Sequence, residues 1–382
     1  MAILDDLMPS LYVGLGTVAR EMVGFIPCVN KNTGAERAAL NEKIRIPTGR
    51  AGQLEDISEA MQTPSTNPGS LGYTEMEITK AKVVPFYWTG EEQLGVANGG
   101  QYNKVIADQF SDCLRKLVNA VEADIAEAAV NGASRAYGTA GTTPFGVAGD
   151  FTDFAQMAKI LDDNGCPVSD RAFVLNSTAF ANLRGKQNLL LKVNEAGSDE
   201  FLRTGYTAPV QGFSIWNSAG IKSHTKGTGS GYTTNLTADL EKGATDVGVD
   251  TGTGTILAGD IVTFAGDLNK YVIGKGADAA GVISLNDPGV MQTLKDGVAM
   301  TIGGDYTPSV AFHRDAIALV ARAPKVPTVG DDAIDSTIIT DPVSGLSFEV
   351  RVYGGYRKVR FEVGLAWGVK CIQPEFCASL IG

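Results

Sequence analysis

The chain has 382 residues, more than one hydrophobic core usually serves, so two or three domains are expected. Its net charge of −11 argues against the basic surface that sequence-specific nucleic-acid binding needs. Apolar residues form 44% of the chain, yet no run approaches the ~18 apolar residues of a membrane span. Cys113 lies on the apolar stripe of a predicted helix, where we expect a buried, reduced thiol. Because the start also lacks a secretory leader, we expect the protein to reside in a reducing cytoplasm.

The N-terminal residues combine apolar side chains with helix breakers. Leu4, Leu7 and Leu11 have helical spacing, and Pro9 and Gly14 interrupt the pattern. This predicts two short amphipathic helices that form an apolar terminal arm. Such an arm docks either on its own body or on a neighbouring subunit.

Two alternating segments follow, which predicts a β-ribbon over about residues 43–84. Ile44 and Ile46 alternate with basic residues, and Met76 and Ile78 alternate with polar ones. Paired antiparallel, they would place the loop-forming run 64–70 at the tip. Because both faces are largely polar, we expect this ribbon to need support from a partner.

The strongest pattern is a helix over residues 101–137. Apolar side chains recur every third or fourth position, and most charged side chains lie off that stripe. A helix of this length spans on the order of 50 Å. It is therefore expected to act as a strut from which the other elements hang.

An α/β unit is predicted next, over residues 150–222. A helix over 151–161 precedes a buried strand at 172–175, and Asn176, Ser177 or Thr178 can cap a second helix. A further strand is expected at 210–216.

The composition changes at Lys222. Sixteen glycines and short β-runs fill residues 223–307, with turn signals about every ten residues, which predicts an inserted β-barrel-like domain. Beyond it, residues 311–320 are interpreted as a strand. Apolar residues occupy every second position at 346–352 and at 359–363, which predicts two strands of a hairpin near the C-terminus.

No catalytic, cofactor-binding or metal-binding constellation emerges from the sequence. The sequence contexts of His224 and His313 indicate surface or hydrogen-bonded roles rather than catalysis. Lys226 begins a glycine-rich run, but this run lacks the residue spacing of a phosphate-binding loop. The remaining candidates are better explained by helix capping, solvated loops and unpaired thiols; they are Asp162, Asp163, Asp331, Asp332, Asp335, Cys371 and Cys377.

The chain resembles the major capsid (coat) protein of tailed bacteriophages, whose fold is the HK-ninety-seven type. The run 171–184 (RAFVLNSTAFANLR) and the run 311–319 (AFHRDAIAL) carry this resemblance, together with Gly368 and Pro374 near the end. The run 258–266 resembles part of the accessory domain of podophage-type coat proteins. The implied fold class is α+β, with an inserted all-β accessory domain.

The resemblance implies a division of the whole chain. The expected parts are an N-terminal arm (1–42), an extended β loop (43–88), a peripheral domain (89–149) with the spine helix 101–137, an axial α/β domain (150–222), the inserted domain (223–307), a continuation of the axial domain (308–345), and closing strands with a tail (346–382).

The implied function is a structural protein that self-assembles into the icosahedral procapsid and mature head around double-stranded DNA. Implied partners are other copies in pentamers and hexamers, scaffolding protein, portal and a decoration protein, with only non-specific DNA contact and no membrane. Assembly would occur in the host bacterial cytoplasm. No scaffold-like region precedes the arm, so a separate scaffolding protein is expected. The candidate intersubunit contacts are Leu4, Leu7, Leu11, Pro64, Asn67, Pro68, Met76, Ile78, Lys80 and Lys82.

Lys80 and Lys82 are interpreted as strand-edge lysines and not as partners in a covalent cross-link. The alternative function is a secreted or surface β-rich binding or adhesion module, which the absent leader and absent disulfide framework disfavour. A glycine-rich hydrolase would need a nucleophile–base pair that the two histidines do not supply.

Overall fold

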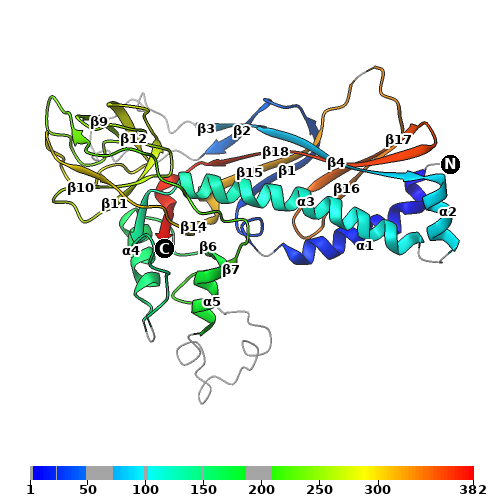
Figure 1. Cartoon of the computed structure of the whole chain (residues 1–382), viewed down its shortest axis with the longest axis horizontal. Helices are drawn as coiled ribbons and strands as arrows, with labels where there is room; N and C mark the ends of the chain where they lie inside the picture. Colours follow the sequence, from blue (N-terminus) through cyan, green and yellow to red (C-terminus); the bar gives the residue numbers. More distant parts are fainter. Residues whose placement is uncertain are drawn as a thin grey trace, which may run out of the picture.

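The computed structural model describes residues 3–22, 24–48, 72–98, 102–147, 150–185, 209–327 and 329–382. The predicted α+β class is confirmed, because a long helix lies beside two large β-sheets. Figure 1 shows an elongated molecule with this helix, α3, along its long axis and the β-rich segment at one end.

Helix α3 (Tyr102–Asn131) is the predicted strut, although it is shorter than expected. The prediction of a helix to residue 137 is wrong, because α3 ends at Asn131 and residues 135–138 form strand β5 (Arg135–Gly138). Gly132 follows the helix, where a Cβ would lie 2.4 Å from the Cβ of Cys371. The buried stripe of α3 includes Ile106, Phe110, Leu114, Leu117, Val121 and Ile125.

The N-terminal residues form one helix, α1 (Ile3–Glu21), where two were predicted. Pro9 lies inside this helix, at a cost of about 3 kcal/mol in a helix interior. Burial of a leucine stripe against α3 offsets that cost, since each buried leucine contributes about 1.5–3 kcal/mol. Arg115 of α3 also forms two hydrogen bonds to the carboxylate of Glu21, at 2.7 and 2.9 Å.

The first sheet has six strands and covers α1 and α3 with one face. Its order is β1 (Asn30–Ala38), β15 (Ile317–Pro324), β18 (Lys358–Cys371), β17 (Ser347–Gly355) and β16 (Ala333–Thr340), with β4 (Lys80–Thr89) beside β18. Side chains on this face, including Phe348, Phe361 and Trp367, are fully or almost fully buried. The predicted C-terminal hairpin is confirmed as β17–β18.

The predicted ribbon is confirmed as β2 (Lys43–Thr48) paired with β3 (Gly72–Glu77), with Ile44 opposite Met76. Its apolar side chains pack on the other face of the first sheet, against small residues that include Ala318, Val320 and Ala366. The sheet is therefore the middle layer between the ribbon and the two helices (Figure 1). The support that the ribbon needs comes from its own chain.

The second sheet has eleven strands and carries the α/β unit. Helix α4 (Thr152–Asp163), strand β6 (Arg171–Leu175) and helix α5 (Ser177–Gly185) confirm the predicted helix, strand and helix. The Asn176 side chain caps α5 by accepting a 2.8 Å hydrogen bond from the amide of Ala179. Strand β7 (Ser214–Asn217) begins four residues later than the predicted run 210–216 and ends one residue beyond it.

The β-rich segment 223–307 has a hydrophobic core of its own, with Tyr232, Val247 and Phe264 among its members. Its strands are β8 (Thr233–Thr234), β9 (Asp246–Asp250), β10 (Ile261–Phe264), β11 (Lys270–Lys275), β12 (Gly281–Leu285) and β13 (Met300–Ile302). Strands β10 to β13 coincide with predicted β-runs at 261–264, 271–273, 282–285 and 298–302, whereas the short β8 and β9 were not predicted. Antiparallel pairing of β11 with β5 joins the segment to the rest of the second sheet.

In the last third of the chain, the point where the chain passes from one sheet to the other differs from the predicted division. Strand β14 (Pro308–His313) belongs to the second sheet, and a 3₁₀ turn at Arg314–Ala316 carries the chain into β15 of the first sheet. The chain therefore changes sheets near residue 315, not at 346. Strand β19 (Cys377–Ile381) then returns to the second sheet between β14 and β5.

Two more elements depart from the predicted parts. Strand β4 lies in the first sheet beside β18, so the extended loop predicted for 43–88 ends before Lys80. Helix α2 (Gly90–Asn98) was not predicted. Thr89 caps it in a capping box, because Thr89 Oγ1 accepts a hydrogen bond from the Glu92 amide at 3.3 Å and Glu92 Oε2 accepts one from the Thr89 amide at 2.8 Å.

Candidate interaction surfaces

His224 is held in a buried hydrogen-bond cluster at the entrance to the β-rich segment. Its Nε2 lies 2.8 Å from Oδ1 of Asp260, which is fully buried. Asp260 also accepts hydrogen bonds from the amides of Gly227 and Leu257. The histidine ring contacts Tyr306, whose hydroxyl donates to the carbonyl of Gly259 at 2.6 Å. This cluster ties together the two chain segments that enter and leave the β-rich segment.

The other polar candidates also have structural partners. His313 Nδ1 accepts the amide of Asp315 at 3.2 Å, and Asp162 pairs with Arg171 at 2.7 Å. Asp335 accepts the amide of Leu4 at 2.9 Å and so caps α1. Among the residues described, no group of three or more His, Cys, Asp or Glu side chains is placed to hold a metal ion.

All five cysteines are free thiols, and four are buried. Burial raises the pKa of Cys28 to about 12 and that of Cys113 to about 11. The prediction that Cys113 is a buried, reduced thiol of the helix stripe is confirmed. Within the ranges described, no helix is both long enough and apolar enough to cross a membrane.

The predicted contacts in the N-terminal arm are buried within their own chain. Leu4, Leu7 and Leu11 are 1%, 5% and 0% exposed, because they pack in the core of their own chain. Met76 and Ile78 of the ribbon are buried against the first sheet. In this conformation, these five side chains pack within their own subunit, and their assignment as intersubunit contacts stays a prediction.

The remaining predicted contacts have different environments. Lys80 Nζ donates to Asp124 Oδ1 of α3 at 2.6 Å, and Lys82 is exposed on β4. Both lysines lie on β4, an edge strand of the first sheet, and not on the ribbon. Pro64, Asn67 and Pro68 lie outside the residues that the structure describes.

A partly exposed surface of tyrosines and arginines lies on the face of the first sheet opposite α3, where Arg351 pairs with Asp331 and Arg360 with Glu362. Tyr353, Arg360 and Tyr87 are direct cross-strand neighbours on β17, β18 and β4. The Arg360 guanidinium lies 5.5 Å from the Tyr87 ring centroid, and that of Arg351 lies 5.4 Å from the Tyr353 ring. Tyrosine and arginine are enriched at protein interfaces. The polar positions of the alternating runs contained this signal, but only the buried positions were used for prediction.

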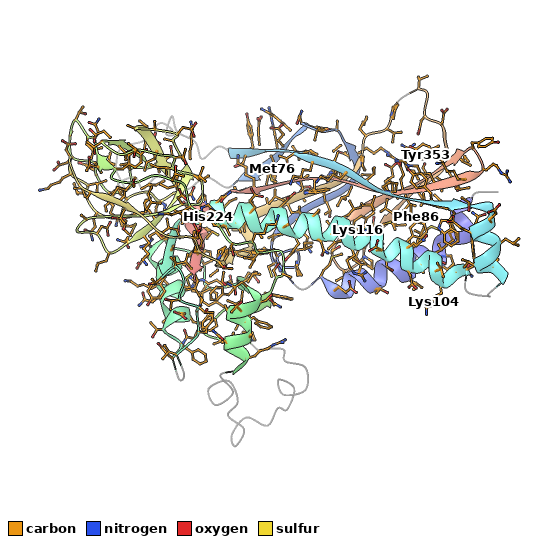
Figure 2. All side chains as sticks on the ribbon, in the orientation of Figure 1. Met76, Phe86, Lys104, Lys116, His224 and Tyr353 are labelled. Atoms are coloured by element: carbon orange, nitrogen blue, oxygen red, sulfur yellow. The ribbon has the colours of Figure 1, made fainter. Side chains whose placement is uncertain are left out.

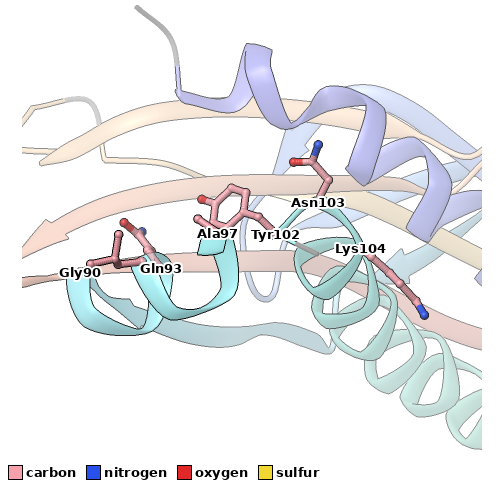
Figure 3. Close-up of a pocket in the computed structure, with 7 residues that line it drawn as sticks. Gly90, Gln93, Ala97, Tyr102, Asn103 and Lys104 are labelled. Atoms are coloured by element: carbon pink, nitrogen blue, oxygen red, sulfur yellow. The ribbon is translucent and has the colours of Figure 1, made fainter. Parts of the chain in front are cut away.

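Helix α2 forms a ridge between two grooves near this surface. One groove, of about 850 Å³, lies between α2 and the start of α3 and is lined by Leu94, Ala97 and Tyr102 among others (Figure 3). The other, of about 600 Å³, lies between α2 and the β17–β18 hairpin. Figure 2 places Tyr353 and Lys104 at this end of the molecule, far from His224.

Comparison with known proteins gave matches among solved structures only. No model of a known protein family matches the sequence, and no curated protein does. A chain from Mycobacterium phage Che8 is 16% identical, with a TM-score of 0.44 over 89% of this chain and 84% of that one. A capsid chain of cyanophage P-SCSP1u is 12% identical, with a TM-score of 0.45 over 94% and 88% of the two chains.

A virus-like particle from Pyrococcus furiosus is similar at the same level. Its chain is 10% identical, with a TM-score of 0.42 over 97% of this chain and 98% of that one. These three matches cover 84% or more of each chain at 10–16% sequence identity.

Proposed function

We propose that this chain is the major capsid protein of a tailed bacteriophage, which assembles into an icosahedral shell around double-stranded DNA. The observation that carries the proposal is the order of the elements along the chain. A terminal helix, a β-ribbon, a long helix, an α/β unit, a β-rich segment and closing strands follow one another as the sequence resemblance implies. The run 311–319 forms the crossing from β14 to β15 between the two sheets.

The proposal includes the finer expectations of the resemblance. Copies associate as pentamers and hexamers, first in a procapsid guided by a scaffolding protein and built on a portal, then in an expanded mature head. In this proposal the β-rich segment 223–307 is an accessory domain, and the head forms in the cytoplasm of the host bacterium. A decoration protein is a further candidate partner.

The net charge supports the proposed relation to DNA. A chain with charge −11 repels phosphate, so packaged DNA would touch the inner wall only non-specifically. The proposal therefore predicts a negative potential on the inner surface of the shell. A strongly positive inner wall would contradict this part of it.

The test is expression of the full chain alone and together with a candidate scaffolding protein, followed by sedimentation and negative-stain electron microscopy. Uniform closed shells, tens of nanometres across, are the expected result. The alternative is a secreted or surface β-rich binding module. A monodisperse monomer under both conditions, with affinity for a carbohydrate or a cell surface, would favour that alternative and overturn the proposal.

A further inference from the structure

Three elements meet at the end of the molecule opposite the β-rich segment. They are the β17–β18 hairpin, helix α2 and the first turn of α3 (Figure 1). The hairpin turn consists of Tyr356 and Arg357, and Arg357 has a positive φ of 55°. The Tyr356 side chain is 91% exposed, so the turn projects a tyrosine away from its own chain.

The charges at this end are separated into two adjacent groups. Arg357 and Lys358 line the 600 Å³ groove on the hairpin side, and Glu91 lines it on the α2 side. Within the described part of the chain, neither Glu91 nor Arg357 forms an ion pair. Lys358 lies 5.1 Å from the ring of Tyr87. Basic and acidic side chains thus face solvent across one groove.

An apolar surface adjoins the acidic group. Leu94 on α2 is 63% exposed and borders the 850 Å³ groove together with Ala97 and Tyr102 (Figure 3). A groove of this size can hold a large side chain. Tyrosine is one of the residue types enriched at the centres of interfaces, because it buries a large area and loses little rotamer entropy.

We propose that the hairpin turn of one copy docks on α2 of a second copy, with Tyr356 beside Leu94 and Arg357 paired with Glu91. This inference rests on the proposed self-assembly and assigns one of its contacts. A second copy is the occupant because the hairpin turn presents Arg357 and an exposed tyrosine, whereas α2 presents Glu91 and an apolar groove. Subunits with a net charge of −11 repel one another, so their contacts need local pairs of opposite charge.

The experiment is a charge exchange on the full chain. Glu91→Lys and Arg357→Glu are made singly and together, and Lys275→Glu on β11 serves as a control with an equivalent charge change at the far end. Glu92 is left intact because it caps α2. Sedimentation velocity at low salt measures the fraction of protein in assemblies, and the thermal melting of unassembled protein checks folding.

Each single variant should weaken assembly at least about tenfold, because like charges then face each other across the contact. The double variant should recover to within about threefold of the wild type, and Lys275→Glu should assemble normally. Singles that assemble like the wild type, or a double variant without recovery, would overturn the inference. Normal assembly of the singles is also the expected result if this surface binds a different protein.

A second measurement does not depend on altered charge. Tyr356→Cys and Leu94→Cys proteins are mixed, assembled and treated with a short bis-maleimide. Linked dimers should form in the mixture and not with either variant alone, which also controls for the native thiols. No linked product in well-formed shells would contradict the contact while leaving the capsid proposal intact. A wild-type protein that forms no shells would instead contradict the capsid proposal.

Discussion

The backbone amide of Phe25 donates a 2.6 Å hydrogen bond to Oε1 of Glu122, in the middle of α3. Glu122 also accepts the amide of Ile26 at 3.1 Å and the hydroxyl of Ser218 at 2.7 Å. One buried carboxylate therefore joins the segment after α1, the strut and the loop after β7. Gly24 is required beside it, since a Cβ there would lie 1.6 Å from Oε1.

Glu122→Ala should strongly destabilise the unassembled subunit. The substitution leaves two backbone amides without an acceptor, at a cost of about 1–3 kcal/mol for each that stays buried. Urea denaturation followed by circular dichroism measures the loss. Glu127→Ala, at an exposed position of the same helix, is the matched control and should change the free energy of unfolding by less than about 0.5 kcal/mol. Equal effects of the two substitutions would contradict the role assigned to Glu122.

The stability of the subunit should also depend on pH through Glu122. Burial raises the pKa of this carboxyl above its ordinary value of 4.5, although its three hydrogen bonds lower it. The folded state therefore binds the proton more tightly than the unfolded state does. The resulting stabilisation is complete below pH 4.5 and is lost as the pH rises through the folded-state pKa. Relative to Glu122→Gln, the wild type should lose stability over this window, as measured by urea midpoints at each pH.

Asp124, half a turn further along α3, should be a second stabilising carboxylate. Its carboxylate accepts hydrogen bonds from Trp367 Nε1 at 2.8 Å and from Lys80 Nζ at 2.6 Å. The indole of Trp367 is fully buried. Asp124→Ala leaves the indole N–H unsatisfied and should cost about 1–3 kcal/mol. The tryptophan emission maximum should shift as the environment of Trp367 changes.

The control for Asp124 is Asp112→Ala on the same helix. Asp112 forms an exposed pair with Lys116 four residues on, and such pairs contribute only about 0.3–0.5 kcal/mol. If Asp112→Ala lowers the free energy of unfolding as much as Asp124→Ala does, then the helix charge, and not the buried hydrogen bond, governs stability.

Periodic patterns in the sequence predicted the main elements of the fold. The stripe of α3, the paired alternation of Ile44 with Met76 and the hairpin β17–β18 were all read correctly, because each depends on local spacing. Helix α2 was missed because its apolar pattern is weak, although the Thr89-to-Glu92 spacing is a recognised start signal.

The partners of the predicted segments could not be read from local spacing. An apolar stripe such as Leu4, Leu7 and Leu11 shows that a helix face is buried, but not which chain buries it. The two sheets divide near residue 315 because of a single 3₁₀ turn, which alternation alone cannot distinguish from a continuous strand. The exposed surface at α2 joins residues that lie more than two hundred and fifty positions apart in the sequence.

Gly368→Ala should displace the ribbon from the first sheet. A Cβ at this position of β18 would lie 2.0 Å from the backbone carbonyl oxygen of Glu77, which cannot move without the ribbon. Overpacking of this kind costs about 1–3 kcal/mol. Hydrogen exchange should increase at the amides of β3, where the ribbon would separate from its support.

Gly364→Ala in the same strand is the matched control. There the nearest atom is Cγ1 of the Val83 side chain, at 3.1 Å, and a side chain can rotate away. The loss of stability should be smaller than that of Gly368→Ala, and exchange at β3 should not change. A larger loss at Gly364 would contradict the close approach of the ribbon at Gly368.

Asp335→Ala should loosen the start of α1 without unfolding the subunit. Asp335 accepts the amide of Leu4, and loss of such a cap costs about 0.5–2 kcal/mol. The effect should be local, because the remaining leucine stripe still packs on α3. Hydrogen exchange should therefore rise only in the first two turns of α1. Asp332→Ala, in the exposed loop nearby, should leave exchange unchanged, and an equal effect there would argue against capping by Asp335.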